Sequence, residues 1–397
     1  MATAPRVARR PPGAGVKLSF NDPVIRAIFW QIVIVGIVGL AVWYLVSNTM
    51  RNLEARRIAS GFAYLWREAG LPIGEAMIEY EPSDNYFRAL VVGVLNTIRV
   101  AIVGIVLSTI LGTLIGVARL SKNWLVAKLA SVYVETLRNL PLLLQLLFWY
   151  SLLQALPPPR QAYNPLPDVF LSIRGVRLPW LNWTPEFVYV IAAFVVGIVV
   201  SFGMRRWARA RQDSTGEQFP TGWATLGLVV GLPAVAFVMV GAPFPVDVPE
   251  LRGFNFVGGI TITPEFTALL IGLVTYTAAF TAEIVRSGIL AVSHGQTEAA
   301  AALGLKRGQA LRLVILPQAM RVIIPPMTSQ YLNITKNSSL AVAIGYPDIV
   351  SIANTILNQT GQAIEGIGTI MAVYLTVSLS ISAFMNWYNR RIALKER

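Results

Sequence analysis

The 397-residue sequence contains no cysteine and a single histidine, His294. Without thiols the chain can form neither disulfides nor thiolate metal sites, and thiol redox chemistry is excluded. No Gly-Lys dipeptide occurs, which excludes a phosphate-binding loop of the G-x-x-x-x-G-K-[ST] type. Acidic residues and histidine nowhere cluster at metal-ligand spacing, and no G-x-S-x-G nucleophile motif occurs. We therefore expect no metal site, no catalytic site and no cofactor in this chain.

Charged residues are also scarce, at 13% of the chain against about 25% in soluble proteins. Hydrophobic residues make up 55% and the mean hydropathy is +0.58. Apolar runs of roughly 18 residues or more can cross the hydrocarbon core of a bilayer as helices, because lipid leaves unpaired backbone groups without partners. The sequence thus predicts an all-α, multi-pass membrane protein. Eight spans are expected, at 27–47, 90–118, 139–156, 186–204, 223–241, 265–285, 311–332 and 366–387.

The net charge of +13 has a topological explanation. Short cytoplasmic loops of membrane proteins hold an excess of Lys and Arg. An orientation with both termini in the cytoplasm collects most of the basic residues inside, whereas the acidic and basic residues of 48–89 balance each other outside. We expect a lipid bilayer as a partner and no nucleic acid.

Two stretches rich in proline and tryptophan, 157–185 and 241–264, flank the fourth and fifth spans. This composition indicates an insertion of two spans into a core of five, with the first span as an added anchor. The expected divisions are 1–89, 90–156 (first part of the core), 157–264 (the insertion) and 265–397 (second part of the core).

Small residues recur every fourth position in the second span, at Ser108, Gly112 and Gly116. Such a face lets two membrane helices approach closely. Packing within the chain and a contact with another subunit are both consistent with it.

One unusually polar loop interrupts the second half of the chain: TEAAAALGLKRGQALRLVILPQ, residues 297–318. Its alanines favour a helix over 298–303, and Gly304 suits a helix C-terminus. A helix this short is not stable alone and needs another surface. The spacing follows the pattern E-A-A-x3-G-x9-I-x-L-P, with Val314 in the isoleucine position.

This loop resembles the EAA loop of ABC importer permeases. The segments 135–150, 276–289 and 333–350 resemble the polar amino acid branch of that family, and the first span, the insertion and 358–365 are similar to permeases of general L-amino-acid transporters. The resemblance implies the transmembrane fold of a type I importer, in a bacterial inner membrane, that carries polar L-amino acids.

The resemblance also implies partners. The loop would form a coupling helix that docks on a separate ATPase subunit, which would hold ATP and Mg. A sister permease, identical or different, and a periplasmic amino-acid-binding protein would complete the assembly. The residues expected to contact the ATPase are Glu298, Ala299, Ala300, Gly304, Lys306, Arg307, Leu316 and Pro317.

Glu-x-x-Arg occurs twice, as Glu135 with Arg138 and as Glu283 with Arg286. Residues three apart face each other on a helix, so each pair can neutralise itself. Charges at membrane depth are also often functional, so structural pairing and substrate contact both remain open.

A zwitterionic substrate needs an acceptor for its ammonium group and donors for its carboxylate, between helices near the bilayer midplane. Glu283 is the candidate acceptor. Lys336 and a helix start at Asn337, Ser338 and Ser339 are candidate donors, because free N–H groups at a helix start attract anions. Alternatively, Asn337 and Ser338 only cap a helix.

Pro325 and Pro326 are expected to interrupt the preceding helix. Asn139 and Gln145 are further candidates for the substrate path.

An ion-coupled secondary transporter is the alternative class. It usually shows a charged relay or an internal repeat, and the sequence shows neither. It would also leave the loop 297–318 unexplained.

Overall fold

The computed structural model describes residues 23–55, 60–181, 184–241 and 246–392. Within these residues, seven helical segments are long and apolar enough to cross a membrane. They comprise α1 (Pro23–Ala55), α2 (Tyr86–Ala118), α5 (Phe187–Thr215), α6 (Thr221–Leu226) continuing through η3 (Gly227–Gly231) into α7 (Leu232–Met239), α8 (Pro264–Leu290), α10 (Arg307–Ala310) continuing through η4 (Leu311–Ile315), α11 (Leu316–Asn337) and η5 (Ser338–Ile344), and α13 (Ala363–Ile392).

The span predicted at 139–156 is shorter than expected. It corresponds to α4 (Leu142–Gln154), whose 13 residues are too few to cross roughly 30 Å of hydrocarbon at 1.5 Å per residue. The preceding helix α3 (Trp124–Asn139) ends just before Leu140 and Pro141. A residue before proline is disfavoured in helical geometry, which separates the two helices. The prediction of eight long spans is therefore wrong at this position.

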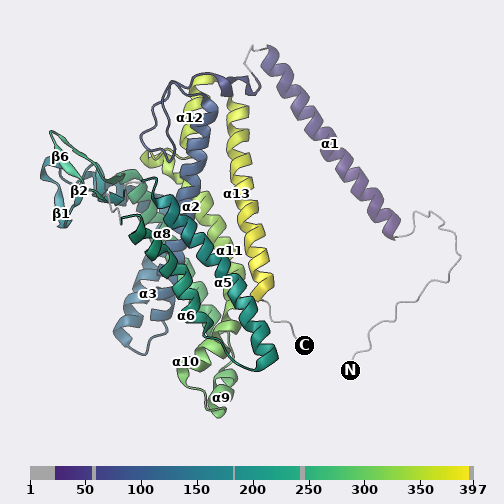
Figure 1. Cartoon of the computed structure of the whole chain (residues 1–397). Coiled ribbons are helices and arrows are strands. Elements are labelled where there is room, and N and C mark those ends of the chain that lie inside the picture. Colours follow the sequence, from purple (N-terminus) through teal and green to yellow (C-terminus); the bar gives the residue numbers. More distant parts are fainter. Residues whose placement is uncertain (1–22, 56–59, 182–183, 242–245, 393–397) are drawn as a thin grey trace.

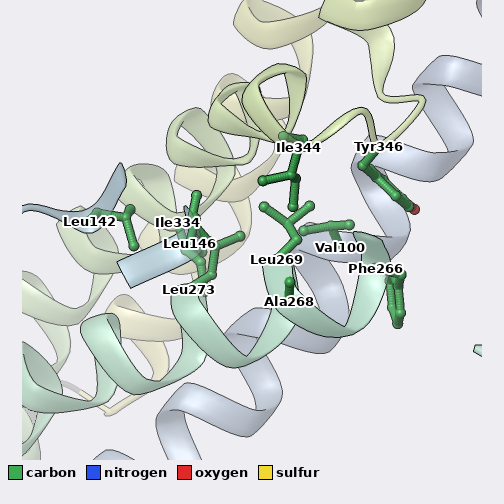
Figure 2. Packing of buried hydrophobic residues seen from close by; sticks show 11 residues of the cluster. Val100, Leu142, Leu146, Phe266, Ala268, Leu269, Leu273, Ile334, Ile344 and Tyr346 are labelled. Carbon is green, nitrogen blue, oxygen red and sulfur yellow. The ribbon is translucent and has the colours of Figure 1, made fainter. Parts of the chain in front are cut away.

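The centre of the bundle is built from helices far apart in the sequence. Val100 of α2, Leu146 of α4, Leu269 and Leu273 of α8 and Ile334 of α11 pack in one buried cluster (Figure 2). Helix α1 lies apart from this bundle over most of its length (Figure 1).

Helices α2 and α8 meet along a seam of small residues. Ser108 is fully buried. A Cβ atom on Gly112 would lie 2.5 Å from the Cβ of Thr281, and one on Gly116 would lie 2.6 Å from the carbonyl oxygen of Ala282. The small-residue face predicted at Ser108, Gly112 and Gly116 therefore packs within the chain, in agreement with the first of the two readings.

The insertion contains strands that the sequence did not predict. A four-stranded antiparallel sheet has the order β1 (Tyr163–Leu166), β2 (Val169–Ser172), β3 (Gly175–Leu178) and β8 (Ile260–Ile262). Two smaller antiparallel pairs join β4 (Trp180–Leu181) to β5 (Val246–Asp247) and β6 (Glu250–Arg252) to β7 (Asn255–Val257). Between β4 and β5 in the sequence, α5 packs on α7 and on η3, where Gly197 lies against the backbone of Leu228.

The segment that follows α1 packs onto the bundle. It contains η1 (Phe62–Trp66), and Tyr64 is buried against Tyr86 of α2 and against Ile352 and Ile356 of α12 (Ile349–Thr360). This end of the bundle, which carries α12, lies opposite the end that carries α9 and α10 (Figure 1). We call it the outer end, following the predicted topology, and the opposite end the inner end.

Candidate functional site

The loop 297–318 protrudes at the inner end as two short helices, α9 (His294–Ala302) and α10 (Figure 1). Gly304 has a φ of +75°, a conformation that other residues adopt only with strain. The predicted short helix and its glycine terminus are confirmed. Only residues 291–293 separate the end of α8 from the start of α9.

Most of the residues expected to contact an ATPase are exposed. The carboxylate of Glu298 is 70% exposed, and among the described residues it pairs with the neighbouring His294 ring, 3.0 Å away. Four more of these residues are exposed: Ala299, Lys306, Arg307 and Leu316. Gly304 has no side chain to present to a partner, and Pro317 is half-buried.

Ala300 departs from this expectation, since it is only 2% exposed. It packs inside the loop, so it shapes α9 and does not present a contact. Leu303, in contrast, is 81% exposed. Leu303 was not among the residues expected to contact an ATPase, although a leucine at the turn of a polar loop is a signal that the sequence shows.

Glu283 lies between two arginines at the inner end of α8. One carboxylate oxygen accepts hydrogen bonds from Arg119, at the end of α2, and from the Nε of Arg286 at 3.2 Å; the other accepts from the Nη2 of Arg286 at 2.5 Å. Arg119 also donates to the hydroxyl of Ser131 on α3, at 3.3 Å. The predicted pairing of Glu283 with Arg286 is formed. Because both oxygens are occupied, the geometry favours the structural reading of Glu283 over the role of ammonium acceptor.

The second predicted pair is not formed within the described residues. Glu135 and Arg138 are both exposed on α3 and share no ion pair. The guanidinium of Arg138 instead lies 5.1 Å from the centre of the Phe280 ring of α8. A cation–π contact of this kind competes with an exposed ion pair, which contributes little.

The expected break at Pro325 and Pro326 is wrong, and the helical segment that starts at Ser338, η5, continues directly from α11. Helix α11 runs through both prolines to Asn337. The N–H of Ser338 donates to the carbonyl of Ile334 and its buried hydroxyl donates to the carbonyl of Thr335. These groups are therefore not free for an anion, and Asn337 makes no capping bond with its side chain.

Lys336 lies on an exposed polar stripe of α11. Ser329, Asn333 and Lys336 are all exposed, at helical spacings of four and three residues, which place them on one face. Among the described residues Lys336 forms no ion pair. A polar face on a membrane helix requires water, a ligand or another chain beside it.

Gln145 and Asn139 occupy different settings. Gln145 is 6% exposed, and its amide donates to the carbonyls of Leu137 and Leu140 at 3.0 and 3.1 Å. It thereby closes the corner between α3 and α4. Asn139 is exposed at the end of α3.

A polar pocket of about 340 Å³ opens at the outer end, between the segment 71–75, the start of α8 and α12. Its wall includes Glu75, whose carboxylate accepts hydrogen bonds from Arg99 of α2 and from the hydroxyl of Thr263, each at 2.5 Å. The amide of Asn96 donates to the backbone carbonyls of Glu75 and Pro347. Sequence patterns gave no signal for this meeting of distant residues.

Asp348 is fully buried just before α12. One carboxylate oxygen accepts from the N–H of Ser351 at 2.8 Å, and the hydroxyl of Tyr374 lies 3.4 Å from the other. Burial raises the pKa of this carboxyl to about 7 despite these hydrogen bonds.

Within the described residues no three His, Cys, Asp or Glu side chains gather as a metal site would require.

Residues 104–394 match the family described as binding-protein-dependent transport system inner membrane component. The chain belongs to this family. The match covers α8, the loop 297–318 and the helices that follow, which confirms the family predicted from the EAA spacing and, with it, the expected helical permease fold.

Curated members of the family are similar over nearly the full chain. The chain is 52% identical to the putative amino-acid ABC transporter permease protein YhdX of Escherichia coli, over 96% of this chain and 97% of that protein. It is 48% identical to the general L-amino acid transport system permease protein AapQ of Rhizobium johnstonii, over 97% and 96%. It is 42% identical to the glutamate/glutamine/aspartate/asparagine transport system permease protein BztB of Rhodobacter capsulatus, over 98% and 100%.

Among solved structures, an amino acid ABC transporter crystallised with histidines aligns with 77% of this chain and 95% of its own, at 22% identity and a TM-score of 0.45.

Proposed function

We propose that the chain is the permease subunit of an ATP-driven importer of L-amino acids in a bacterial inner membrane. The observation that carries this proposal is the exposed α9–α10 loop with its EAA spacing, in a chain whose sequence has no phosphate-binding loop. ATP and Mg would bind to separate ATPase subunits docked on the loop. A binding protein would take part, as the family description implies. We further propose that this binding protein is periplasmic and that a sister permease, identical or different, completes the assembly.

The proposed substrates are L-amino acids, over a broad range. The family members named above include permeases for general L-amino acids and for acidic amino acids and their amides. An amino acid carboxylate needs a cationic or N–H donor. The ammonium of Lys336, which forms no ion pair within the described part of the chain, offers one beside Asn333 and Ser329 on a single face of α11.

The coupling role is tested by charge reversal at Glu298. Glu298→Lys should reduce co-purification of the ATPase subunits and uptake of radiolabelled amino acids into proteoliposomes. The reason is that a lysine ammonium cannot accept the hydrogen bond that the Glu298 carboxylate would accept from the ATPase, and it would place a positive charge against that donor. The side chain is 70% exposed, so folding should not suffer. Glu217→Lys is the matched control, since Glu217 is 68% exposed in the loop between α5 and α6. Equal co-purification and uptake of both variants would contradict the coupling role.

The substrate role is tested by Lys336→Gln. A lost charge-assisted hydrogen bond costs about 1.5–3 kcal/mol, so the amino acid concentration for half-maximal uptake should rise tenfold or more while ATPase co-purification is unchanged. Lys122→Gln, in the loop between α2 and α3, is the control. An unchanged concentration dependence would remove Lys336 from the path.

The energy source for uptake distinguishes an ATP-driven importer from an ion-coupled secondary transporter. Uptake should require ATP inside the proteoliposomes and should proceed without an ion gradient. Uptake driven by an ion gradient without ATP would instead support the secondary transporter.

A further inference from the structure

Helices α2 and α8 are joined at their inner ends by the group Arg119, Glu283 and Arg286. Their side chains are 12%, 27% and 31% exposed, so the ion pairs are shielded from much of the water and salt that weaken surface pairs. Arg119 belongs to the end of α2, and the other two residues belong to α8. We call these three residues the inner clamp.

The start of α8 is joined to the middle of α2 by a second acidic residue. Glu75, 11% exposed, bridges Arg99 of α2 and Thr263, the residue that caps α8. The Arg99 guanidinium also stacks on the ring of Phe266 of α8, 4.1 Å from its centre. We call Glu75, Arg99 and Thr263 the outer clamp.

Between the clamps lies the seam of Gly112 and Gly116. The positions where Cβ atoms would stand are already filled by Thr281 and by the backbone of Ala282. Close-packed helices of this kind do not slide without opening the contact. Twenty residues separate Arg99 from Arg119 along α2, which at 1.5 Å per residue places the clamps about 30 Å apart.

We propose that α2 and α8 move as one rigid lever, locked by the inner clamp and the outer clamp. The lever carries displacement of the loop 297–318, the coupling loop, directly to the polar pocket at the outer end, the outer pocket. This inference rests on the proposed function, because it assumes that an ATPase moves the loop. Residues 291–293 connect α9 directly to α8, and the amide of Gln318 on α11, which also packs on α8, donates to Gln296 of α9 at 3.2 Å. Movement of α9 is thus passed to α8 and, through Glu283, to α2. At the other end, Glu75 and Thr263 line the outer pocket. Glu283 and Glu75 are positioning residues in this scheme.

Pulsed electron paramagnetic resonance tests the rigidity directly. The chain has no cysteine, so spin labels can be confined to Leu114→Cys on α2 and Leu290→Cys on α8, both exposed at 64% and 58%. In the assembly with its ATPase, the distance between the labels should be the same with and without ATP. A distance that changes with ATP would overturn the lever.

The clamps are tested by neutral variants of equal size. Glu283→Gln should lower the amount of amino acid transported per ATP about tenfold, the loss expected for charge-assisted hydrogen bonds, while ATPase co-purification and basal hydrolysis persist. The label distance should then change with ATP. Glu135→Gln removes an exposed carboxylate from α3 that forms no ion pair among the residues the structure describes. It should leave both readouts unchanged.

At the outer end, Glu75→Gln should also lower transport per ATP, and Glu79→Gln, an exposed carboxylate in the same segment, should not. Glu283→Asp should recover part of the loss, since it restores the charge. Native transport per ATP in Glu283→Gln would overturn the inner clamp. If Glu283→Gln does not assemble, the distance between the two spin labels in the protein with intact clamps still tests whether α2 and α8 move as one rigid body. Failure of the ATPase to bind the unaltered chain would instead refute the proposed function itself.

Discussion

Adding a single methyl group at Gly112 should measurably destabilise the fold. The added Cβ would lie 2.5 Å from the Cβ of Thr281 and 2.9 Å from the carbonyl oxygen of Ala278. Carbon atoms in contact normally lie about 3.5–4.0 Å apart, so the two helices would have to separate by about 1 Å at this point. Overpacking of a tight core costs about 1–3 kcal/mol, and we expect Gly112→Ala to fall in this range.

Gly→Ala substitutions at two other glycines serve as comparisons for the loss of stability expected at Gly112. Gly104→Ala would meet only the end of the Ile334 side chain, at 2.9 Å, which can rotate away, so its cost should be smaller. Gly203→Ala on α5 would meet nothing within 4 Å. It should stabilise α5 by about 0.5–1 kcal/mol, since alanine loses less backbone freedom than glycine in a helix.

The measurement is the unfolding temperature of the purified permease in detergent, with all three variants prepared in parallel. The expected order of stability is Gly203→Ala above the unaltered protein, then Gly104→Ala, then Gly112→Ala. Thr281→Gly combined with Gly112→Ala should recover part of the loss. If Gly112→Ala unfolds at the temperature of Gly203→Ala, the tight packing of α2 on α8 is refuted.

Other substitutions test separate features. Because the pKa of Asp348 is about 7 when folded and its ordinary value is 3.8, the folded state holds a proton that the unfolded chain releases; stability should therefore fall from about pH 4 to about pH 7 and level off above. Asp348→Asn, which keeps an N-cap, should match the unaltered protein in unfolding temperature near pH 4 and exceed it at pH 8; the same difference in stability at both pH values would contradict the buried carboxyl. The hydroxyl of Thr281 has no hydrogen-bond partner among the described residues, so Thr281→Val should be neutral or stabilising in the same thermal assay, and a loss of several degrees would reveal a partner. Leu303→Ser, at the exposed tip of the coupling loop, should weaken ATPase co-purification without changing the unfolding temperature, and unchanged co-purification would show that Leu303 makes no contact.

Features encoded by local sequence could be predicted well. Long apolar runs gave the spanning helices, the run of alanines ending at Gly304 gave α9, and the four-residue spacing of Gly112 and Gly116 gave a packing face. Each depends on neighbours within a turn or two of helix. The family assignment was equally accessible, because the EAA spacing is local as well.

Contacts between residues far apart in the chain could not be predicted from the sequence. Glu283 pairs with Arg119, which is 164 positions away, and Glu75 meets Thr263 across 188; no single-sequence pattern indicates either contact. The prolines of α11 were misjudged for a related reason. Within a packed bundle, neighbouring helices hold a proline-containing helix together, and local propensity alone predicts a break.

The pairing of β3 with β8 determines how the insertion is attached. Val176 lies opposite Ile262 and Leu178 opposite Ile260, so the chain leaves the core and returns to it through adjacent strands at the start of α8. The helical hairpin formed by α5 and α7, which lies between these strands in the sequence, is therefore attached to the core at one place, the β3–β8 pair. An arrangement of this kind lets an added membrane hairpin vary in length, sequence or tilt without rerouting any helix of the core, and it makes the hairpin a natural place to attach a label or a foreign domain.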